Sequence, residues 1–214
     1  MPRQARAIAD GLVYHALNRG NNRATVFHDD DDYRAFVDLL HAAMDRVPMR
    51  LLAFCLMPNH FHLALWPTTD DALSRWMGWL TTAHVRRYQS HYGTTGHVWQ
   101  GRFKAFAIQD DDHLLAVLRY IERNPLRANL VARAEDWPWS SLSSSWPFLD
   151  RGPVARPSDW LDLVNQPQTQ AELDRLRQSV NRGVPFGNDA WSKQTATALG
   201  LEATLRDRGR PKQK

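Results

Sequence analysis

The first 130 residues alternate between short apolar runs and longer amphipathic stretches. The short runs, which prolines and polar turns bound, span 12–18, 49–57, 60–66 and 97–109. Their length and bounds are typical of β-strands. The amphipathic stretches, whose apolar residues recur at helical spacing, span 28–47, 71–93 and 110–130. The resulting β-α-β-β-α-β-α order predicts an α+β protein of the ferredoxin-like, split β-α-β type, with helices on one face of an antiparallel sheet.

Local signals set several boundaries. The acidic residues 29–32 precede the first helical stretch, where they can cap the helix and place negative charge at its positive end. The short link "MPN" joins the second and third strands, which are therefore expected to form a hairpin. Pro125 has no amide hydrogen to donate, so the last of these helices must stop near it.

The character of the chain changes after about residue 135. Residues 1–135 are expected to form the main domain. Residues 136–200 are rich in proline and tryptophan and predict an irregular arm packed on that domain, with a mainly helical extension at 169–182 and 190–199. Residues 201–214 are basic and are expected to be disordered. Their "RGRPK" run resembles an AT-hook, although a solubilising tail explains so short a match at least as well.

Composition narrows the class of protein. The only cysteine, Cys55, lies in an apolar run and is expected to be a small core residue. No stretch approaches the roughly 18 apolar residues of a membrane helix, and no secretory leader is recognisable, so a cytoplasmic protein is expected. Nine tryptophans are many for 214 residues. Some can pack in the core, and others can stack on unpaired bases. The candidates for stacking are Trp76, Trp79, Tyr88 and Trp99.

The basic residues point to an anionic partner. Only four of the 27 are lysines, and arginine is the residue better suited to bidentate phosphate contacts. Residues 72–109 contain no acid, and a second basic row follows at i, i+4 and i+8 of the last helical stretch. A solvated helix face explains any single basic residue, but explains the acid-free segment less well. The candidate DNA-binding residues are Arg75, Arg86, Arg87, Arg102, Lys104, Arg119, Arg123 and Arg127.

Two pairs of residues carry the candidate chemistry. His60 and His62 are two apart on a predicted strand, so both imidazoles point to one face and can share a metal ion. Taken alone, this pair is weak evidence in a chain with nine histidines. Tyr120 and Asn124 are four apart on a predicted helix and also share a face, at the margin of the buried stripe formed by Leu114, Leu118 and Ile121. Plain packing of the tyrosine and a capping role for the asparagine are the alternatives.

Several separated motifs, in order along the chain, resemble the REP-associated tyrosine transposases, which are bacterial relatives of the single-tyrosine HUH transposases. They are "MPNHFHLALWP", "HVWQGRFKAFAI", "YIERNPLRANLV", "DWPWSS" and "GVPFGNDAW". The resemblance extends from "YHALNRGNNR" to the tail. The family's ferredoxin-like sheet, with the tyrosine on a following helix, agrees with the order of elements read above.

The resemblance implies a site and a reaction. His60 and His62 would be metal ligands, Tyr120 the nucleophile, and Asn124 a third, amide ligand, although glutamine or histidine is more usual there. The metal would be Mg²⁺ or Mn²⁺, and residues 1–135 would be the catalytic domain. The protein would cut and join single-stranded DNA at REP-type hairpins through a covalent 5′-phosphotyrosine, with no nucleotide cofactor. The family also implies a monomer associated with the nucleoid. No general base is evident, and Glu122 is expected to be a surface charge or a salt-bridge partner.

Two other functions remain open at this point. A non-catalytic module that binds single-stranded nucleic acid on a ferredoxin-like sheet would share the basic surface, but its usual sheet motif is only loosely echoed in "QGRFKAF". A zinc-dependent hydrolase could use the histidine pair, but such enzymes of the barrel type need more strands than are predicted here.

Overall fold

The computed structural model describes residues 8–143 and 146–206, and its core is a four-stranded sheet. The strands are β1 (Val13–Arg19), β2 (Met49–Met57), β3 (His60–Pro67) and β4 (Lys104–Ile108). They lie in the order β2-β3-β1-β4, and every neighbouring pair is antiparallel. This is the predicted ferredoxin-like arrangement, and the β2–β3 hairpin is confirmed.

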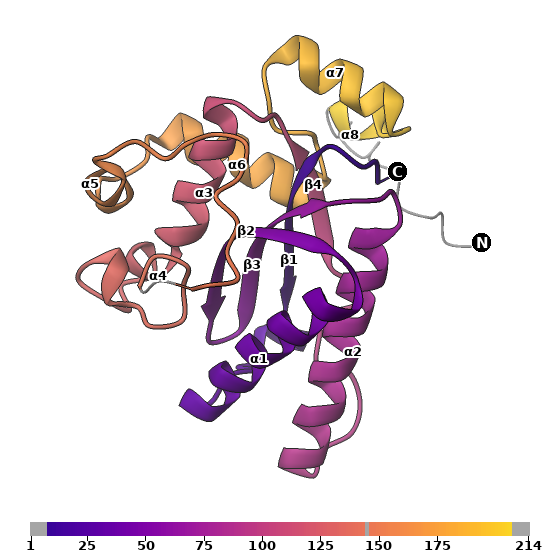
Figure 1. The fold of residues 1–214 in the computed structure, drawn as a ribbon, viewed down its shortest axis with the longest axis vertical. Coiled ribbons are helices and arrows are strands. Elements are labelled where there is room, and N and C mark those ends of the chain that lie inside the picture. The colour runs from indigo at the N-terminus through magenta and orange to yellow at the C-terminus, as the bar shows by residue number, and fades with distance from the viewer. Residues whose placement is uncertain (1–7, 144–145, 207–214) are drawn as a thin grey trace, which may run out of the picture.

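Helices cover both faces of the sheet (Figure 1). The helices are α1 (Asp30–Arg46), α2 (Ala72–Tyr92), α3 (Asp112–Glu122), α4 (Asn124–Arg127), α5 (Trp160–Asn165), α6 (Gln170–Arg182), α7 (Asp189–Ala198) and α8 (Glu202–Leu205). As expected, the two helices of the split β-α-β unit, α1 and α2, share one face. The trailing helix α3 lies on the opposite face with α5 and α6. Side chains along each strand alternate between the two faces, and they belong to two separate hydrophobic clusters.

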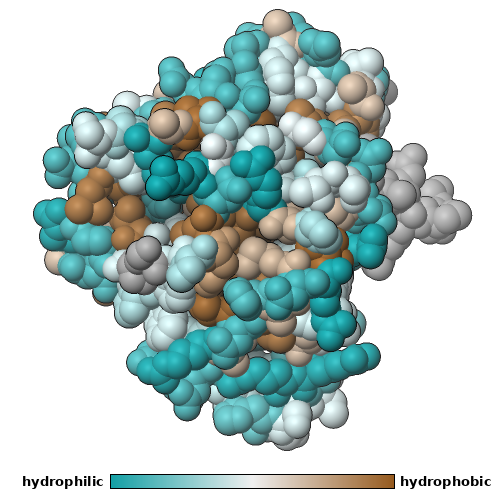
Figure 2. Space-filling model, in the orientation of Figure 1, coloured by the Kyte–Doolittle hydropathy of each residue, from teal (hydrophilic) through white to brown (hydrophobic). Residues whose placement is uncertain are grey.

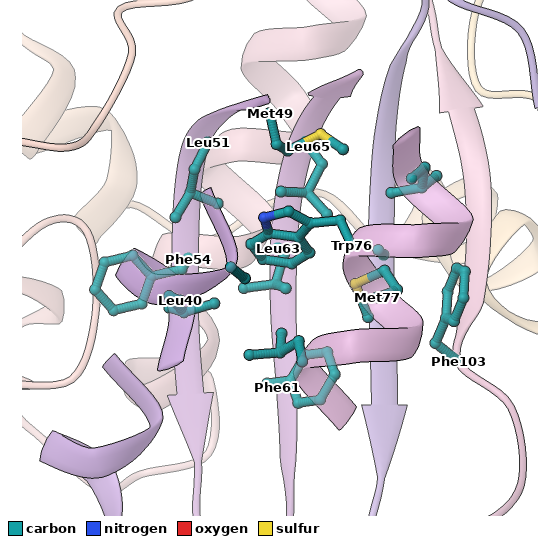
Figure 3. Close-up of a cluster of buried hydrophobic side chains, with 14 of the residues drawn as sticks. Leu40, Met49, Leu51, Phe54, Phe61, Leu63, Leu65, Trp76, Met77 and Phe103 are labelled. Carbon is teal, nitrogen blue, oxygen red and sulfur yellow. The ribbon is translucent and has the colours of Figure 1, made fainter. Parts of the chain in front are cut away.

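The cluster under α1 and α2 is the larger core (Figure 3). Phe61, Leu63 and Leu65 project from β3 toward Trp76 and Met77 of α2, and all five are fully buried. Figure 2 shows hydrophilic residues over the lower part of the molecule, where α1 and α2 present their outer faces to solvent. The amphipathic pattern of these two stretches thus becomes a core face and a solvent face.

Several boundaries follow from the local signals. Asp29 caps α1 by accepting a hydrogen bond from the amide of Asp32 at 3.0 Å. The helix α3 ends at Glu122, and Pro125 lies in the first turn of α4, where its missing amide hydrogen costs no hydrogen bond. The predicted strand 97–109 is too long: only Lys104–Ile108 is strand. Gly96 and Gly101 have φ of 94° and 86°, so the segment before β4 is a loop that turns at these two glycines.

The segment after residue 135 packs on the sheet as expected. At the β2 edge, Leu56 N donates to Trp139 O and Ser141 N donates to Phe54 O. At the β4 edge, Phe186 N donates to Ala107 O. The helices expected at 169–182 and 190–199 are α6 and α7. Of the segment expected to be a disordered tail, 202–205 form α8, and the "RGRPK" run lies outside the described residues.

Candidate active site

The histidine pair lies on the face of the sheet that α3 covers. His60 and His62 occupy the first and third positions of β3, and their ring centroids are 4.9 Å apart. In the β1–β3 register, His62 lies opposite Leu17 and His60 opposite Arg19. The expectation that both imidazoles share one face is therefore met.

Tyr120 and Asn124 converge on this pair from the helices above it. The Tyr120 ring lies edge-on to His62, with centroids 5.7 Å apart and an interplanar angle of 86°. The break between α3 and α4 leaves Tyr120 in the last turn of one helix and Asn124 at the start of the next. Both are buried, at 6% and 2% exposure, and thus lie deeper than the core margin expected from the helical wheel.

A third histidine, His15, completes the cluster. It is fully buried on β1, and its Nε2 atom lies 2.8 Å from His62 Nδ1. Such a contact needs one protonated and one bare nitrogen. With the proton on His62 Nδ1, the Nε2 atom of His62 keeps a lone pair that can bind a metal. His15 is therefore placed to fix the tautomer and orientation of His62.

The histidines of the cluster are held neutral. Burial, together with the Arg19 and Arg127 charges, lowers the pKa of His60 to about 4. Burial also lowers the pKa of His62 well below its ordinary value, helped by its histidine and arginine neighbours. Neutral imidazoles have the lone pairs that metal ligation requires. The pair is therefore in the correct protonation state for a ligand near neutral pH.

The available donors decide what kind of ion could bind. Among the residues that the structure describes, no group of three or more His, Cys, Asp or Glu side chains could hold a metal ion. A third protein ligand would have to be the amide of Asn124. Its Nδ2 atom is buried without a hydrogen-bond partner in the described part of the chain, whereas its Oδ1 atom accepts from Arg127. A carbonyl oxygen has two lone pairs, so Oδ1 keeps one for an ion. Two imidazoles and an amide thus fit a divalent ion.

Seven of the eight candidate DNA-binding residues fall into two groups, and the first group is engaged within the fold; the eighth, Arg127, donates to Tyr120 and Asn124. Arg87 Nη1 donates to the buried Asp32 at 2.7 Å and joins α2 to α1. Arg119 Nη2 donates to the carbonyl of Gln166 at 2.8 Å, and Arg123 donates to the carbonyls of Val164 and Asn165. These contacts give all three a structural role, and their contact with DNA stays a prediction.

The second group lies at or near a large cavity. Arg86 and Arg102 line a space of about 1150 Å³ between α2 and the loop 96–103. Arg75, one turn into α2, pairs with Asp71 at 3.2 Å. Lys104 is exposed at the start of β4. The predicted strand 97–109 would place Arg102 and Lys104, two residues apart, on one face, but Arg102 lies in the loop before the strand. The Gly101 turn is the physical reason, since its φ of 86° interrupts the extended backbone.

Other site expectations need correction. Glu122 is no surface charge: it is 1% exposed, accepts from Trp160 Nε1 at 2.7 Å, and pairs with Arg156 at 3.4 Å. The salt-bridge alternative is the right one. Trp76 and Trp99 are core residues, because the helix α2 and the loop turn their rings inward.

Two site residues escaped the sequence reasoning. His15 is the third residue of β1, with apolar residues on both sides, and a histidine there is itself a signal of a buried polar contact. Arg19 ends the same strand directly opposite His60, and its charge contributes to the lowered His60 pKa. Nothing in the sequence around Arg19 marks it as a site residue, because strand pairing has to be known before Arg19 can be placed beside the histidines.

Comparison with known proteins agrees with this geometry. A family model described as "Transposase IS200 like" matches residues 9–124, more than half of the chain. A putative REP-associated tyrosine transposase of Haemophilus influenzae is 30% identical over 127 residues, which cover 54% of this chain and 69% of the relative. A REP-associated tyrosine transposase of Escherichia coli is 28% identical over 142 residues, which cover 63% and 78% of the two chains.

A solved structure has the same fold. It is a REP-associated tyrosine transposase bound to a REP hairpin, with a TM-score of 0.52 and 21% identity, and the match covers 79% of this chain and 99% of that one. The family match spans the strands and the helix that carry both histidines, Tyr120 and Asn124. On the sequence matches, the chain belongs to the IS200-like transposases and, within them, to the REP-associated tyrosine transposases.

Proposed function

We propose that the protein cuts and rejoins single-stranded DNA beside a hairpin, with Tyr120 as the nucleophile. The observation that carries this proposal is the packing of Tyr120 edge-on against His62, beside His60, although sixty residues of sequence separate them. The names of the relatives support the DNA substrate, and the solved relative bound to a REP hairpin supports the hairpin.

The reaction conserves the number of phosphoester bonds. The Tyr120 oxygen forms a bond to phosphorus and the bond from phosphorus to the 3′-oxygen breaks. The phenol loses its proton and the 3′-oxygen gains one, so the DNA leaves with a free 3′-OH while its 5′-phosphate stays on the tyrosine. Attack by a 3′-OH on this ester reverses the step and joins strands. No external energy source is required, because each step exchanges one ester for another.

His60, His62 and Asn124 are the residues that would hold the divalent ion. A bound Mg²⁺ or Mn²⁺ would polarise the scissile phosphate and offset the charge that develops on it. Mn²⁺ tolerates imidazole ligands better than Mg²⁺, whereas phosphate oxygens suit both. Within the chain, the roles are simpler: the histidines present neutral lone pairs, His15 orients His62, and the buried pocket limits the access of water to Tyr120.

The DNA strand is proposed to contact the basic residues of the segment 72–109 beside α2. Arg86 and Arg102 in the cavity beside α2, and the Lys104 next to it, lie on the acid-free segment 72–109. The loop that lines the cavity is joined to the end of β1 beside Arg19, because Asn21 N donates to Val98 O and Gln100 N donates to Arg19 O. Phosphate contacts of this kind make binding fall steeply with salt.

The Tyr120→Phe variant tests the nucleophile. We expect it to bind a REP-type hairpin like the wild type and to form no covalent adduct, because only the hydroxyl is lost. The measurement is a denaturing gel of protein incubated with 5′-extended hairpin DNA and Mn²⁺. An adduct that survives denaturation in the variant would show that another residue attacks.

The wild-type result separates the alternatives. Binding that survives chelation, with no adduct for any hairpin, would instead support a non-catalytic nucleic-acid-binding module. Release of free product without an adduct, dependent on zinc, would support a hydrolase.

A further inference from the structure

Arg127 is bonded to both residues that reach the histidine pair from the helices. Its Nη2 atom lies 3.3 Å from the Tyr120 hydroxyl and 3.2 Å from Asn124 Oδ1. Its guanidinium carbon also lies 4.5 Å from the centroid of the Tyr120 ring. Arg127 is thus stacked on the phenol and linked to its oxygen at the same time.

The sequence predicted that Arg127 contacts DNA as part of a basic row on the helix, and the observed arrangement differs from that prediction. A phosphate ligand keeps its guanidinium toward solvent, as an exposed side chain on a helix does. Arg127 is instead half-buried, and its Nη2 atom donates to both a phenol and an amide. An arginine cannot accept a proton at any pH where the protein is folded, so Arg127 is no general base for Tyr120.

The elements around Tyr120 hold its ring and Arg127 in a fixed arrangement. Asn124 and Arg127 are three residues apart on α4, so they occupy one face of that helix. The Tyr120 ring also makes T-shaped contacts with His15 and His62, at centroid distances of 6.1 and 5.7 Å. The guanidinium and the two imidazoles thus limit the positions that the ring and its oxygen can adopt. A nucleophile misplaced by about 1 Å can lose about a hundredfold in rate.

We propose that Arg127 is a positioning residue for strand cleavage, which fixes the Tyr120 oxygen and the Asn124 amide in one arrangement against the histidine pair. This inference rests on the proposed function, since it assigns to Tyr120 the attack on phosphorus. It changes the role expected for Arg127 from a ligand of the DNA backbone to a support of the nucleophile. Loss of Arg127 should therefore slow the chemistry without weakening the binding of DNA.

The first measurement observes Tyr120 without any reaction. In protein labelled with ¹³C at the tyrosine ring, the Tyr120 resonance is identified as the one missing from Tyr120→Phe. We expect it to shift and broaden in Arg127→Gln, because the ring loses its stacked cover and its hydroxyl partner. It should be unchanged in Arg177→Gln, the matched control, whose guanidinium lies on α6 and pairs only with Asp174 at 3.2 Å in the described residues. An unchanged Tyr120 resonance in Arg127→Gln would overturn the proposal.

The second measurement separates positioning from DNA binding. Affinity for a hairpin is measured over a range of salt, and the adduct rate is measured in a single turnover at saturating DNA with Mn²⁺. For Arg127→Gln we expect unchanged affinity and salt slope with an adduct rate about 100-fold lower. Loss of one phosphate contact would instead weaken binding and reduce the slope by about 0.7–0.9. That pattern, with a normal saturating rate, would also overturn the proposal.

The Arg127→Lys variant guards against a merely structural effect. A lysine keeps the charge but has no planar guanidinium to stack on the Tyr120 ring, so we expect partial recovery of rate and of the Tyr120 resonance. Millimolar guanidinium should raise the rate of Arg127→Ala and leave the wild type unaffected. If the wild type forms no Tyr120 adduct at all, the proposed function fails, and the tyrosine resonance alone then decides whether Arg127 orders the ring.

Discussion

His15 is the residue whose importance depends most on its neighbours. It makes no contact with solvent, and its Nε2 atom lies within hydrogen-bond distance of His62 Nδ1. Burial lowers the pKa of His15 to about 3, so it remains neutral at every pH where the protein would work. A neutral partner can fix the tautomer of His62 without adding charge to the pocket. If His62 binds a metal as proposed, its supporting residue is a histidine rather than the more usual carboxylate or carbonyl.

Replacing His15 should therefore weaken metal binding. We expect His15→Ala to lower the affinity for Mn²⁺ by about 10- to 100-fold, because His62 Nδ1 loses the partner that orients its ring. The measurement is a Mn²⁺ titration followed by electron paramagnetic resonance, with His41→Ala as the control, since His41 is exposed on α1. An unchanged affinity in His15→Ala would show that the contact does not orient the ligand.

The two histidines and the asparagine should contribute unequally. We expect His60→Ala or His62→Ala to abolish metal-dependent adduct formation. Asn124→Ala should lower the rate by only about 10- to 100-fold, because Asn124 Oδ1 is already shared with Arg127. Single-turnover adduct formation with Mn²⁺ measures all three variants. Full activity in either histidine variant would exclude the ligand role, and an inert Asn124→Ala would raise the asparagine to an equal ligand.

At the scale of elements, a buried carboxylate joins the two helices on the larger core. Asp32 of α1 is 1% exposed and accepts hydrogen bonds from Arg87 Nη1 at 2.7 Å and from the Tyr92 hydroxyl at 2.6 Å, both on α2. These bonds, with one from the His28 amide, outweigh the effect of burial and lower the pKa of the Asp32 carboxyl. The acidic run at the start of α1 thus supplies a cap and an interhelical ion pair.

Removing that carboxylate should destabilise the fold. We expect Asp32→Ala to lower the free energy of unfolding by about 3 kcal/mol, because Arg87 is left partly buried without its acid. The neighbouring Asp30→Ala is the matched control, since Asp30 is exposed and its 3.7 Å pair with Arg34 contributes little. Urea unfolding followed by tryptophan fluorescence gives both values. Equal effects of the two substitutions would contradict the interhelical role.

At the scale of the whole molecule, residues after 135 complete the sheet. They cover the outer edges of β2 and β4, which would otherwise expose unpaired backbone groups. Arg50 on β2 forms a bidentate pair with Asp150, and Glu122 on α3 is satisfied by Ser141, Arg156 and Trp160. The boundary at 135 is therefore a change in sequence character, while the packed core continues across it.

Buried histidines make the stability of the molecule depend on pH. His84 lies among Phe27, Phe36 and Trp99, and burial lowers its pKa to about 4. The unfolded chain takes up this proton near pH 6.5, whereas the folded protein takes it up only near pH 4. Between these values the unfolded state binds more protons, so stability rises with pH and falls on acidification.

We expect His84→Phe to reduce this pH dependence. Its free energy of unfolding should change with pH between about 6.5 and 4 with a slope smaller by about 1.4 kcal/mol per pH unit than in the wild type, because one proton uptake is removed. Urea unfolding of both proteins at several pH values in this window measures the two slopes. Identical slopes would show that His84 is not neutral in the folded state.

The architecture was accessible from the pattern of residues because periodicity reports burial locally. Strands 49–57 and 60–66 lie within a residue of β2 and β3, and residues 29–32, Pro58 and Pro125 mark turns and helix ends through their own backbone chemistry. The start of β4 was misplaced, because the left-handed conformation of Gly101 cannot be read from composition. The short helix α5 was missed because six residues carry too little periodic signal.

The candidate site also has a part that local sequence spacing predicts and a part that it does not. The spacing of His60 and His62, and of Tyr120 and Asn124, places each pair on one face of its own element, and that much follows from strand and helix geometry. Whether the two pairs meet depends on strand order and on the face that α3 covers, which are non-local. The roles of His15 and Arg19 became visible only with the strand register, because contacts between distant segments leave no periodic trace in the chain. The bonds of Arg127 join residues at most seven positions apart, and they became visible only with the side chains of α3 and α4 in place.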